Sequence, residues 1–319
     1  MKMKIVFLDF MTIGEDIDLS KFSQLGEVIT YDNSTEEEAA LRSREADVLI
    51  VNKVNVNEKT ISQADHLKLV CVSATGTNNL DKDYLAKRGI PWKNVAGYST
   101  NCVAQHTFAL LFYLLEKLPA FDQYVKSGDY ASSSSFTWLG RKYHEIAGLT
   151  WGIIGLGAIG RKVADIASAF GAHVIYASAS GKAPQEGYEQ VSLDELYERS
   201  DIISIHAPLN EYTHHLLNKE AFSKMKDSCI LLNLGRGPIV VEEDLYEALV
   251  NGNIAAAGLD VLEKEPMSPD HPLLKIQDSG KLIITPHIAW AGIETRKRLM
   301  DMVYEQIDKT VSCISESEG

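Results

Sequence analysis

Short apolar runs alternate with amphipathic segments over the first hundred residues, and this alternation predicts strands and helices in turn. Between the strands, Ser34–Arg44 and Asp81–Arg88 have the composition of helices, and Ser34 with Glu37 would form a capping box. Strands that alternate with helices favour a parallel sheet in a doubly wound layer. The runs richest in β-branched residues, which we expect as strands, are Ile5–Leu8, Val28–Tyr31, Val48–Val51 and Leu69–Val72.

The stretch from Thr150 to Gly171 has the pattern of a strand, a glycine turn and a helix. An apolar run ends in Gly155, Gly157 and Gly160. In dinucleotide-binding proteins, three such glycines allow the tight turn, the approach of backbone N–H groups to a pyrophosphate, and close packing of helix on strand. The stretch therefore predicts a dinucleotide site at the helix N-terminus, with a purely structural turn as the alternative. The apolar residues that recur at helical spacing in this stretch are Ile159, Val163, Ile166 and Phe170.

Strands and helices continue to alternate after the glycine turn. Helices are expected near Ser192–Glu198, where Ser192 and Glu195 would form a second capping box, and near Glu242–Val250, which Gly252 would stop. The repeated strand-helix unit predicts a second parallel sheet of the Rossmann type. The further strands are expected at His173–Tyr176, Asp201–His206, Ser228–Asn233, Ile254–Leu259 and Leu282–Thr285.

Two other segments indicate how the parts are joined. Asn101–Leu118 is apolar around most of its circumference, so we expect it to be buried between layers or at a subunit contact. It is interpreted as the crossing between domains and as part of a dimer interface. Glu294–Ile314 is amphipathic and is expected to return to pack on the first domain.

Composition narrows the class of protein. The chain has 319 residues, the length of about two domains, and a formal net charge of −13, which argues against nucleic acid as a partner. No apolar run is long enough for a membrane span, and Asp9 interrupts the first one, which reads as a strand rather than a signal peptide. The four cysteines are scattered without a CxxC pair, so we expect a reduced cytoplasmic protein with no disulfide framework and no metal site.

Three groups with complementary chemistry follow different strands of the second sheet. Arg236 lies in a Gly-Arg-Gly loop, Glu265 follows the next strand and His287 follows the last one. Ligands of open parallel sheets bind at the carboxyl ends of strands, so these groups are expected to converge there. The arginine can bind a substrate carboxylate, the histidine can exchange a proton with a substrate oxygen, and the glutamate can orient the imidazole. Each residue also has a non-catalytic interpretation: Arg236 as a surface residue, His287 as a structural histidine and Glu265 as a solvated carboxylate.

Seven stretches together resemble the D-isomer-specific 2-hydroxyacid dehydrogenases over nearly the whole chain. The resemblance implies that Arg236 binds the substrate carboxylate, that Glu265 supports the histidine and that His287 is the acid/base. The stretches are SATGTNNLD, NCVAQHTFALL, GIIGLGAIGR, SDIISIHAPL, NLGRGPIVVEEDL, AAAGLDVLEKEP and TPHIAWAG.

The same resemblance implies further substrate contacts. A loop of Ala74, Thr75 and Gly76 in the first domain would offer backbone N–H groups to the carboxylate, and the cleft between the domains would close on the substrate. PHIAW resembles the glycerate dehydrogenase (hydroxypyruvate reductase) branch, in which Trp290 would lie near the pocket. The reaction implied is the reduction of hydroxypyruvate or glyoxylate to the D-hydroxy acid.

The expected architecture follows from these observations. The fold class is α/β, with two doubly wound parallel-sheet domains. A Rossmann dinucleotide-binding domain at residues 100–289 is inserted in a flavodoxin-like substrate domain at residues 1–99 and 290–319. The expected partners are a small 2-keto or 2-hydroxy acid and a second copy of the chain, bound through the Asn101–Leu118 region.

The cofactor is expected to be NADP or NAD, with NADP preferred. NAD sites usually place an Asp or Glu at the end of the second Rossmann strand to bind the ribose 2′-hydroxyl. Here that strand is followed by Ser178, Ser180 and Lys182 without an acid, so hydroxyls and an ammonium are available for a 2′-phosphate. A solvated loop in an NAD enzyme is the alternative. The residues expected to contact the dinucleotide are Thr107, Gly155, Gly157, Ala158, Ile159, Gly160, Ser178, Ser180, Lys182, His206, Ala207, Pro208, Leu234, Gly235, Arg236 and Asp260.

Two other functions are compatible with these motifs. A dinucleotide-sensing corepressor or scaffold of the same fold would resemble the enzyme at Arg236, Glu265 and His287 and turn over little substrate. The lack of a basic or low-complexity tail in the sequence argues against it. Formate or phosphite oxidation on the same scaffold fits a carboxylate-binding arginine and PHIAW less well than a 2-hydroxy acid does.

Overall fold

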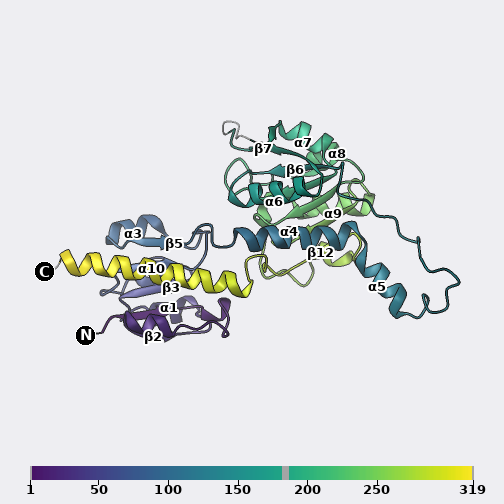
Figure 1. The fold of residues 1–319 in the computed structure, drawn as a ribbon. Coiled ribbons are helices and arrows are strands. Elements are labelled where there is room, and N and C mark those ends of the chain that lie inside the picture. The colour runs from purple at the N-terminus through teal and green to yellow at the C-terminus, as the bar shows by residue number, and fades with distance from the viewer. Residues whose placement is uncertain (1, 182–186, 318–319) are drawn as a thin grey trace. The chain divides into compact units, whose positions relative to one another are not determined.

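The computed structural model describes residues 2–181 and 187–317, leaving aside the side chains of residues 312–317. The chain forms two compact units (Figure 1). Unit 1 comprises Met1–Ser99 and Ala291–Gly319, and unit 2 comprises Thr100–Trp290. One unit is therefore inserted in the other, and Trp290 lies at the end of unit 2, one residue beyond the boundary expected from the sequence.

Unit 1 contains a five-stranded parallel sheet in the order β2-β1-β3-β4-β5, the doubly wound order of flavodoxin-like folds. The first four strands confirm the predicted ones to within a residue at each end. The fifth strand was not predicted, because three residues that include a lysine and an asparagine carry no apolar pattern. The strands are β1 (Lys4–Phe7), β2 (Glu27–Thr30), β3 (Val48–Val51), β4 (Leu69–Val72) and β5 (Trp92–Asn94).

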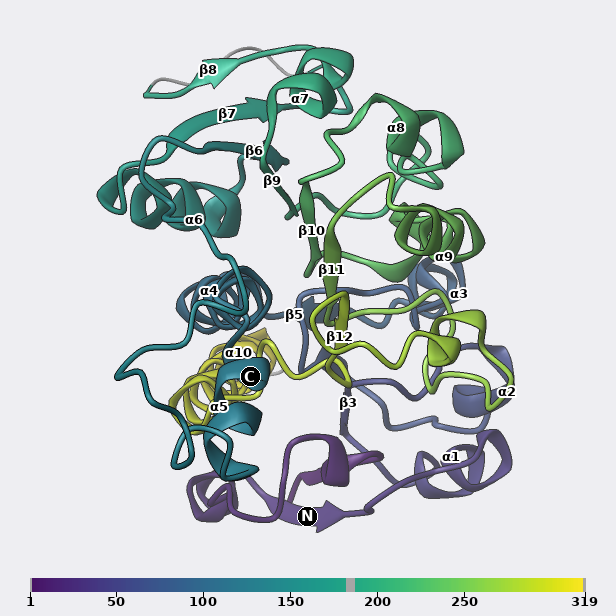
Figure 2. The ribbon, with the colours of Figure 1, turned by 90° about the vertical axis from the view of Figure 1, so that its right-hand side faces the viewer.

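Helices cover both faces of this sheet (Figure 2). On one face lie α1 (Glu36–Arg42), α2 (Glu58–Ile61) and α3 (Lys82–Arg88), and on the other lies α10 (Ile293–Ser317). The predicted return of the C-terminal helix to the first domain is confirmed, since α10 belongs to unit 1. Its ring contact between Tyr304 and Phe22, with centroids 5.6 Å apart, continues the core formed by β1.

The capping box of α1 lies one residue later than predicted. Thr35 accepts a hydrogen bond from the backbone N–H of Glu38, whose carboxylate in turn accepts from the Thr35 N–H. The predicted N-cap, Ser34, instead donates its hydroxyl proton to the carbonyl oxygen of Leu8, 2.6 Å away. Two candidates of the same type, each followed by a glutamate three residues later, made the register ambiguous in the sequence.

Unit 2 contains a seven-stranded parallel sheet in the order β12-β11-β10-β9-β6-β7-β8. Strand order reverses at β6, as in a Rossmann fold, and this confirms the predicted architecture. Only β8, which is two residues long, was not predicted. The strands are β6 (Thr150–Ile154), β7 (His173–Ala177), β8 (Glu189–Gln190), β9 (Ile202–Ile205), β10 (Ile230–Asn233), β11 (Ala256–Leu259) and β12 (Leu282–Ile284).

The two faces of the unit 2 sheet carry separate apolar cores. In Figure 2, α4 (Thr100–Leu115) and α6 (Ala158–Ala169) lie on one face. On the other face lie α7 (Leu193–Arg199), α8 (Lys219–Lys224) and α9 (Glu242–Asn251). The sheet is thus buried on both sides, as its near-continuous apolar strands require.

The apolar segment expected as one helix over Asn101–Leu118 is divided in two. The first helix, α4, ends at Leu115, and Lys117 adopts a left-handed backbone with φ of 56° before α5 (Leu118–Lys126) begins. Most of the apolar circumference of α4 is buried in the core of its own unit. Its composition is therefore explained by packing inside unit 2, without a second subunit.

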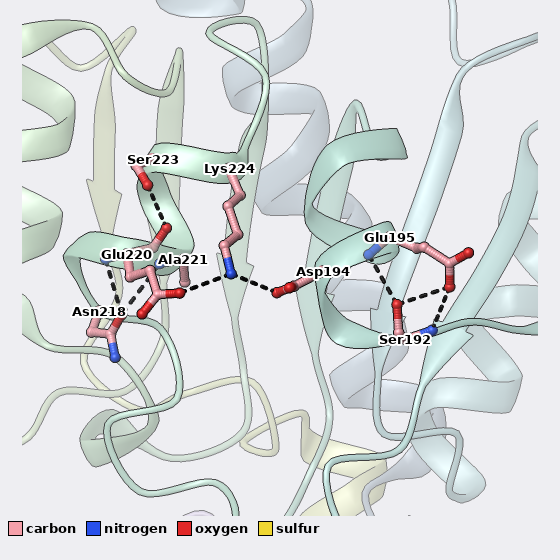
Figure 3. Close-up of polar contacts among 8 residues, drawn as sticks. All are labelled: Ser192, Asp194, Glu195, Asn218, Glu220, Ala221, Ser223 and Lys224. Carbon is pink, nitrogen blue, oxygen red and sulfur yellow. Dashed lines mark hydrogen bonds and ion pairs between the residues drawn. The ribbon is translucent and has the colours of Figure 1, made fainter.

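Polar contacts link α7 and α8, the helices that lead into β9 and β10 (Figure 3). The predicted capping box of Ser192 and Glu195 is confirmed. Lys224 contacts Asp194 on α7 at 2.8 Å and Glu220 on its own helix at 2.9 Å. Hydrogen bonds to these two carboxylates raise the pKa of Lys224 above its usual range, and the bond to Asp194 contributes most.

Two observations bear on the compartment-related predictions. Among the described residues, none of the helices combines the length and the apolar character needed to cross a membrane. Cys71, Cys102 and Cys229 are free thiols, and burial raises the pKa of Cys71 and of Cys229 to about 12. The two buried thiols are therefore unreactive at neutral pH.

Candidate active site

The glycine turn between β6 and α6 has the geometry expected of a phosphate cradle. Gly155 has φ of 94°, and a Cβ there would lie 2.8 Å from the backbone of Ala207. A Cβ at Gly160 would collide with the carbonyl oxygen of Gly155, so helix and turn are in direct contact. A Cβ at Gly157 would meet no atom within 4 Å, and no described side chain caps the helix that begins at Ala158. The helix N-terminus is thus open to an anion such as a pyrophosphate.

The helix after this turn packs through smaller residues than the sequence pattern suggested. Of the four apolar residues that recur at helical spacing, Val163 is fully buried, Ile159 and Ile166 are partly buried against the same core, and Phe170 is 47% exposed. The small residues Gly160, Ala164 and Ala167 form the rest of the buried face. The contact between α6 and the sheet is close enough to favour these small side chains.

The ends of β9 and β10 lie against the same turn. Both ring nitrogens of His206 are buried and have no hydrogen-bond partner among the described residues, and burial lowers the pKa of this imidazole to about 3. Pro208 is exposed, and a Cβ at Gly235 would lie 3.0 Å from the carbonyl oxygen of Ala207. Leu234 is buried beside Gly235. A neutral histidine with two unsatisfied nitrogens, next to an open helix N-terminus, fits a polar ligand such as a dinucleotide.

The predicted adenosine-ribose contacts follow β7. Ser178 and Ser180 come directly after this strand, and Ser180 is exposed. Ser178 accepts a backbone hydrogen bond from Gly181 at 3.1 Å, which closes the turn. Lys182 lies outside the described residues.

Thr107 is placed differently from the other predicted cofactor contacts. Its side chain is fully buried on α4, and its hydroxyl donates to the carbonyl oxygen of Val103 at 2.8 Å. The hydroxyl is therefore already engaged within its own helix.

Asp260 organises the loop that carries His287. The carboxylate is 2% exposed and accepts hydrogen bonds from the Thr285 hydroxyl at 2.6 Å and from the backbone N–H groups of Ile288 and Ala289, each at 2.9 Å. His287 lies between these contacts with a left-handed φ of 56°. Such a backbone costs about 1–3 kcal/mol and persists where surrounding contacts fix it. Asp260, predicted as a cofactor contact, thus has a structural partner for each carboxylate oxygen.

Glu265 and His287 are in direct contact, as the sequence predicted. The Nδ1 atom of His287 lies 2.7 Å from Oε2 of Glu265, and Oε1 of the glutamate accepts a hydrogen bond from the Leu262 N–H at 3.0 Å. Both side chains are partly open to solvent, at 27% and 33% exposure for histidine and glutamate. The carboxylate can therefore hold a proton on Nδ1, and Nε2 remains for chemistry on a bound molecule.

Arg236 lies in a loop packed against the one that carries Glu265. A Cβ at Gly237 would collide with the carbonyl of Leu262, so only glycine allows the two loops this contact. Asn233 closes the loop by donating from Nδ2 to the Arg236 carbonyl at 3.1 Å and by accepting from the Gly235 N–H at 3.1 Å. The guanidinium donates to the Gly235 carbonyl at 2.8 Å and is partly exposed.

The other predicted substrate contacts lie on both units. Ala74, Thr75 and Gly76 follow β4 in unit 1, where the Thr75 hydroxyl donates to the Val95 carbonyl at 2.9 Å. Trp290 closes unit 2 and is partly buried.

Several residues that shape the site were missed in the sequence. Glu242 is 6% exposed, contacts Nε2 of His271 at 2.8 Å, and accepts from the Glu263 N–H at 2.8 Å, close to Glu265. His106 contacts Thr285 and thereby the loop of His287. Glu242 and His106 lie in helical segments, where a polar residue is normally expected on the solvent-exposed side. No local signal in the sequence therefore distinguishes them from surface residues.

A Rossmann unit with an open helix N-terminus and a carboxylate-oriented histidine at its strand ends defines a dinucleotide-dependent oxidoreductase. Residues 108–289 match the family described as D-isomer specific 2-hydroxyacid dehydrogenase, NAD binding domain, and the chain belongs to that family. The resemblance found in the sequence is thereby confirmed. The protein is an oxidoreductase that acts on CH–OH groups with a nicotinamide dinucleotide.

Similarity to individual proteins extends over nearly the whole chain. The chain is 38% identical over 313 residues to the hydroxypyruvate reductase of Blautia hydrogenotrophica, covering 96% of both chains. It is 36% identical over 313 residues to the glycerate dehydrogenase of Methylorubrum extorquens, covering 98% of this chain and 97% of the other. Among solved structures, the NADPH-dependent glyoxylate/hydroxypyruvate reductase from Sinorhizobium meliloti in complex with NADP and malonate has a TM-score of 0.80 at 27% identity, covering 97% and 93% of the chains.

Substitution of the turn glycines separates fold from ligand binding. Gly157→Ala adds a methyl group in open space, so the free energy of unfolding of the apoprotein should change by less than about 1 kcal/mol. Because that methyl lies where the pyrophosphate would approach, dinucleotide affinity should fall by on the order of tenfold or more. Calorimetric titration and chemical denaturation measure the two quantities. The matched variant Gly160→Ala should instead lower the stability of the apoprotein by about 1–3 kcal/mol. Unchanged affinity in Gly157→Ala would contradict the cradle.

Proposed function

We propose that this protein reduces a small 2-oxo acid to the D-2-hydroxy acid, with hydroxypyruvate or glyoxylate as the preferred substrate. The observation that carries the proposal is the 2.7 Å contact between His287 Nδ1 and Glu265 Oε2 at the carboxyl edge of the unit 2 sheet. The relatives named hydroxypyruvate reductase and glycerate dehydrogenase support the choice of substrate.

The proposed roles follow from the chemistry of each side chain. Arg236 binds the substrate carboxylate through its fork of N–H donors. Glu265 accepts a hydrogen bond from Nδ1–H of His287 and stabilises the imidazolium, which gives its Nε2 proton to the carbonyl oxygen of the substrate. The nicotinamide, when bound, supplies the hydride. In the oxidation of a hydroxy acid, His287 takes the hydroxyl proton back.

The strained backbone of His287 suits this role. A left-handed residue held by contacts on both sides has little freedom to turn its ring away from Glu265. Fixing the proton donor in this way lowers the reorganisation needed when a substrate is bound. That Ala74, Thr75 and Gly76 bind the carboxylate, and that Trp290 borders the pocket, remain predictions based on the resemblance.

Replacement of the proposed acid/base tests this assignment. His287→Ala should lower kcat for hydroxypyruvate by about 10²–10⁴-fold, because the proton transfer loses its donor. Dinucleotide affinity, measured by fluorescence titration, should stay as in the wild type, since the cradle is formed by other residues. His173→Ala, which removes an exposed imidazole from the same unit, is the matched control. Wild-type turnover on none of a panel of 2-oxo acids, with dinucleotide binding intact, would favour the sensing or scaffold alternative.

We propose NADP as the preferred dinucleotide. The segment after β7 has no carboxylate in the described part, residues 178–181, that would repel a 2′-phosphate, and it carries two hydroxyl groups at Ser178 and Ser180. The similarity to the NADPH-dependent glyoxylate/hydroxypyruvate reductase from Sinorhizobium meliloti supports the same choice.

A carboxylate placed in this segment tests the preference. Wild-type kcat/KM at one hydroxypyruvate concentration should be higher with NADPH than with NADH. Ser178→Asp should reverse the order by lowering kcat/KM with NADPH on the order of tenfold or more, through repulsion of the 2′-phosphate. Ser228→Asp, the same change on an exposed turn of the same unit, should leave the ratio unaltered. A wild-type enzyme that is faster with NADH would overturn the proposal.

We also propose that the protein is a homodimer. Since α4 is buried in its own unit, the surface available to a second copy lies in the segment that continues from it, which extends away from the body of unit 2 in Figure 1. Exposed apolar side chains are grouped there: Phe136 is 90% exposed, Leu139 83% and Tyr143 55%. Such a group on one segment is typical of an interaction surface.

The mass of the protein in solution tests the dimer. Sedimentation velocity should give about twice the chain mass for the wild type, and Leu139→Asp with Phe136→Asp should give the monomer because charge opposes burial of this surface. Met11→Asp, at one of the exposed apolar residues of unit 1, should leave the dimer intact. A monomeric wild type at micromolar concentration would rule out the assignment.

A further inference from the structure

A histidine that the proposed reaction does not use lies beside the loop that carries His287. His106 is on α4, and its Nε2 atom is 3.0 Å from the hydroxyl of Thr285 and 3.6 Å from Oδ1 of Asp260. The imidazole is 19% exposed. One turn further along, Leu110 packs on Gly258 of β11, where a Cβ would lie 3.2 Å from the Leu110 Cβ. The position of His106 relative to the sheet is therefore fixed by packing.

The direction of each hydrogen bond follows from which groups can donate. Asp260 has a carboxylate, which only accepts, so the Thr285 hydroxyl donates its proton across the 2.6 Å contact. The hydroxyl oxygen then has only lone pairs left, and the nitrogen of His106 must donate to it. A competing acceptor for the hydroxyl proton, the Leu259 carbonyl, lies at 3.5 Å. The donated bond from His106 thus helps to keep the hydroxyl turned toward Asp260.

The same carboxylate determines the backbone of His287. Asp260 holds Thr285 on one side of this residue, and Ile288 and Ala289 on the other. Within that span the N–H of His287 donates to the Thr285 carbonyl at 2.9 Å, and φ is 56°. A chain of hydrogen bonds therefore runs from His106 through Thr285 and Asp260 to the peptide groups that flank the proposed proton donor.

We propose that His106 is a positioning residue for His287. Acting through the Thr285 hydroxyl, it keeps Asp260 in the arrangement that holds the left-handed backbone of His287 and so keeps the ring against Glu265. This inference rests on the proposed function for its effect on turnover, but not for its effect on the contact between His287 and Glu265. In the absence of the donor, the hydroxyl turns between two acceptors, the loop relaxes, and the ring spends less time beside the carboxylate.

A double-mutant cycle on the apoprotein tests the geometry without substrate or cofactor. The variants are His106→Leu, Thr285→Val and the two combined. In histidine-labelled protein, the Nδ1–H proton of His287, assigned by its loss in His287→Gln, reports the contact with Glu265. In His106→Leu its exchange with solvent should become faster by about tenfold, as expected for a more frequently opened hydrogen bond. In the Thr285→Val background, His106→Leu should add nothing, because the path through the hydroxyl is already broken.

Conservative variants separate positioning from a general loss of structure. His106→Gln keeps an N–H donor near the place of Nε2, and Thr285→Ser keeps the hydroxyl, so both should retain slow exchange even if the larger changes perturb folding. His173→Leu, at an exposed histidine on β7, should leave the signal as in the wild type. Unchanged exchange in His106→Leu, or an equal effect with and without Thr285, would overturn the proposal.

Turnover provides a second measurement. His106→Leu should lower kcat for hydroxypyruvate by on the order of tenfold, with dinucleotide affinity unchanged, because displacement of a proton donor affects chemistry rather than cofactor binding. If the wild type reduces no 2-oxo acid while the exchange data behave as described, the proposed function fails and the positioning role stands. If the wild type reduces 2-oxo acids normally and His106→Leu does not change the exchange of the His287 proton, the positioning role fails and the proposed function stands.

Discussion

A single buried carboxylate determines the shape of the site. Asp260 is almost fully removed from solvent, and a charge in that position is tolerated only if hydrogen bonds replace its lost hydration. The hydroxyl of Thr285 and two backbone N–H groups provide that replacement, and all of them come from the loop after β12. The same hydrogen bonds therefore compensate the buried charge and fix the conformation of the loop. The strained residue in the middle of this loop is His287.

The architecture could be predicted because its signals are local and repeated. Apolar runs such as Val48–Val51 and Leu69–Val72 became strands with almost the expected ends, since a strand buried on both faces needs an uninterrupted apolar sequence. β5 and β8 escaped prediction because edge strands of two or three residues form through pairing with a neighbour rather than through their own composition. The break at Lys117 was missed for a related reason: its left-handed backbone has no signature in a lysine.

The site was predicted in part, along the same line of reasoning. The contact between Glu265 and His287 was expected from their places at neighbouring strand ends and from their chemistry. Glu242 and His106 could not be found in this way, because the backbone or side-chain group that each contacts is remote in sequence. Asp260 was predicted as a cofactor contact, and this stays a prediction. Its hydrogen bonds to the loop of His287 could not be foreseen, since a carboxylate at a strand end gives no sign of which backbone groups donate to it.

The insertion of unit 2 into unit 1 has a consequence for the order of folding during synthesis. Every strand and helix of the inserted unit lies between Thr100 and Trp290, so this unit is complete before α10 emerges from the ribosome. The sheet of unit 1 is made first, yet one of its apolar faces stays uncovered until Tyr304 and its neighbours on α10 arrive to meet Phe22. The strands of the first hundred residues thus belong to a core that closes only after α10 has been made.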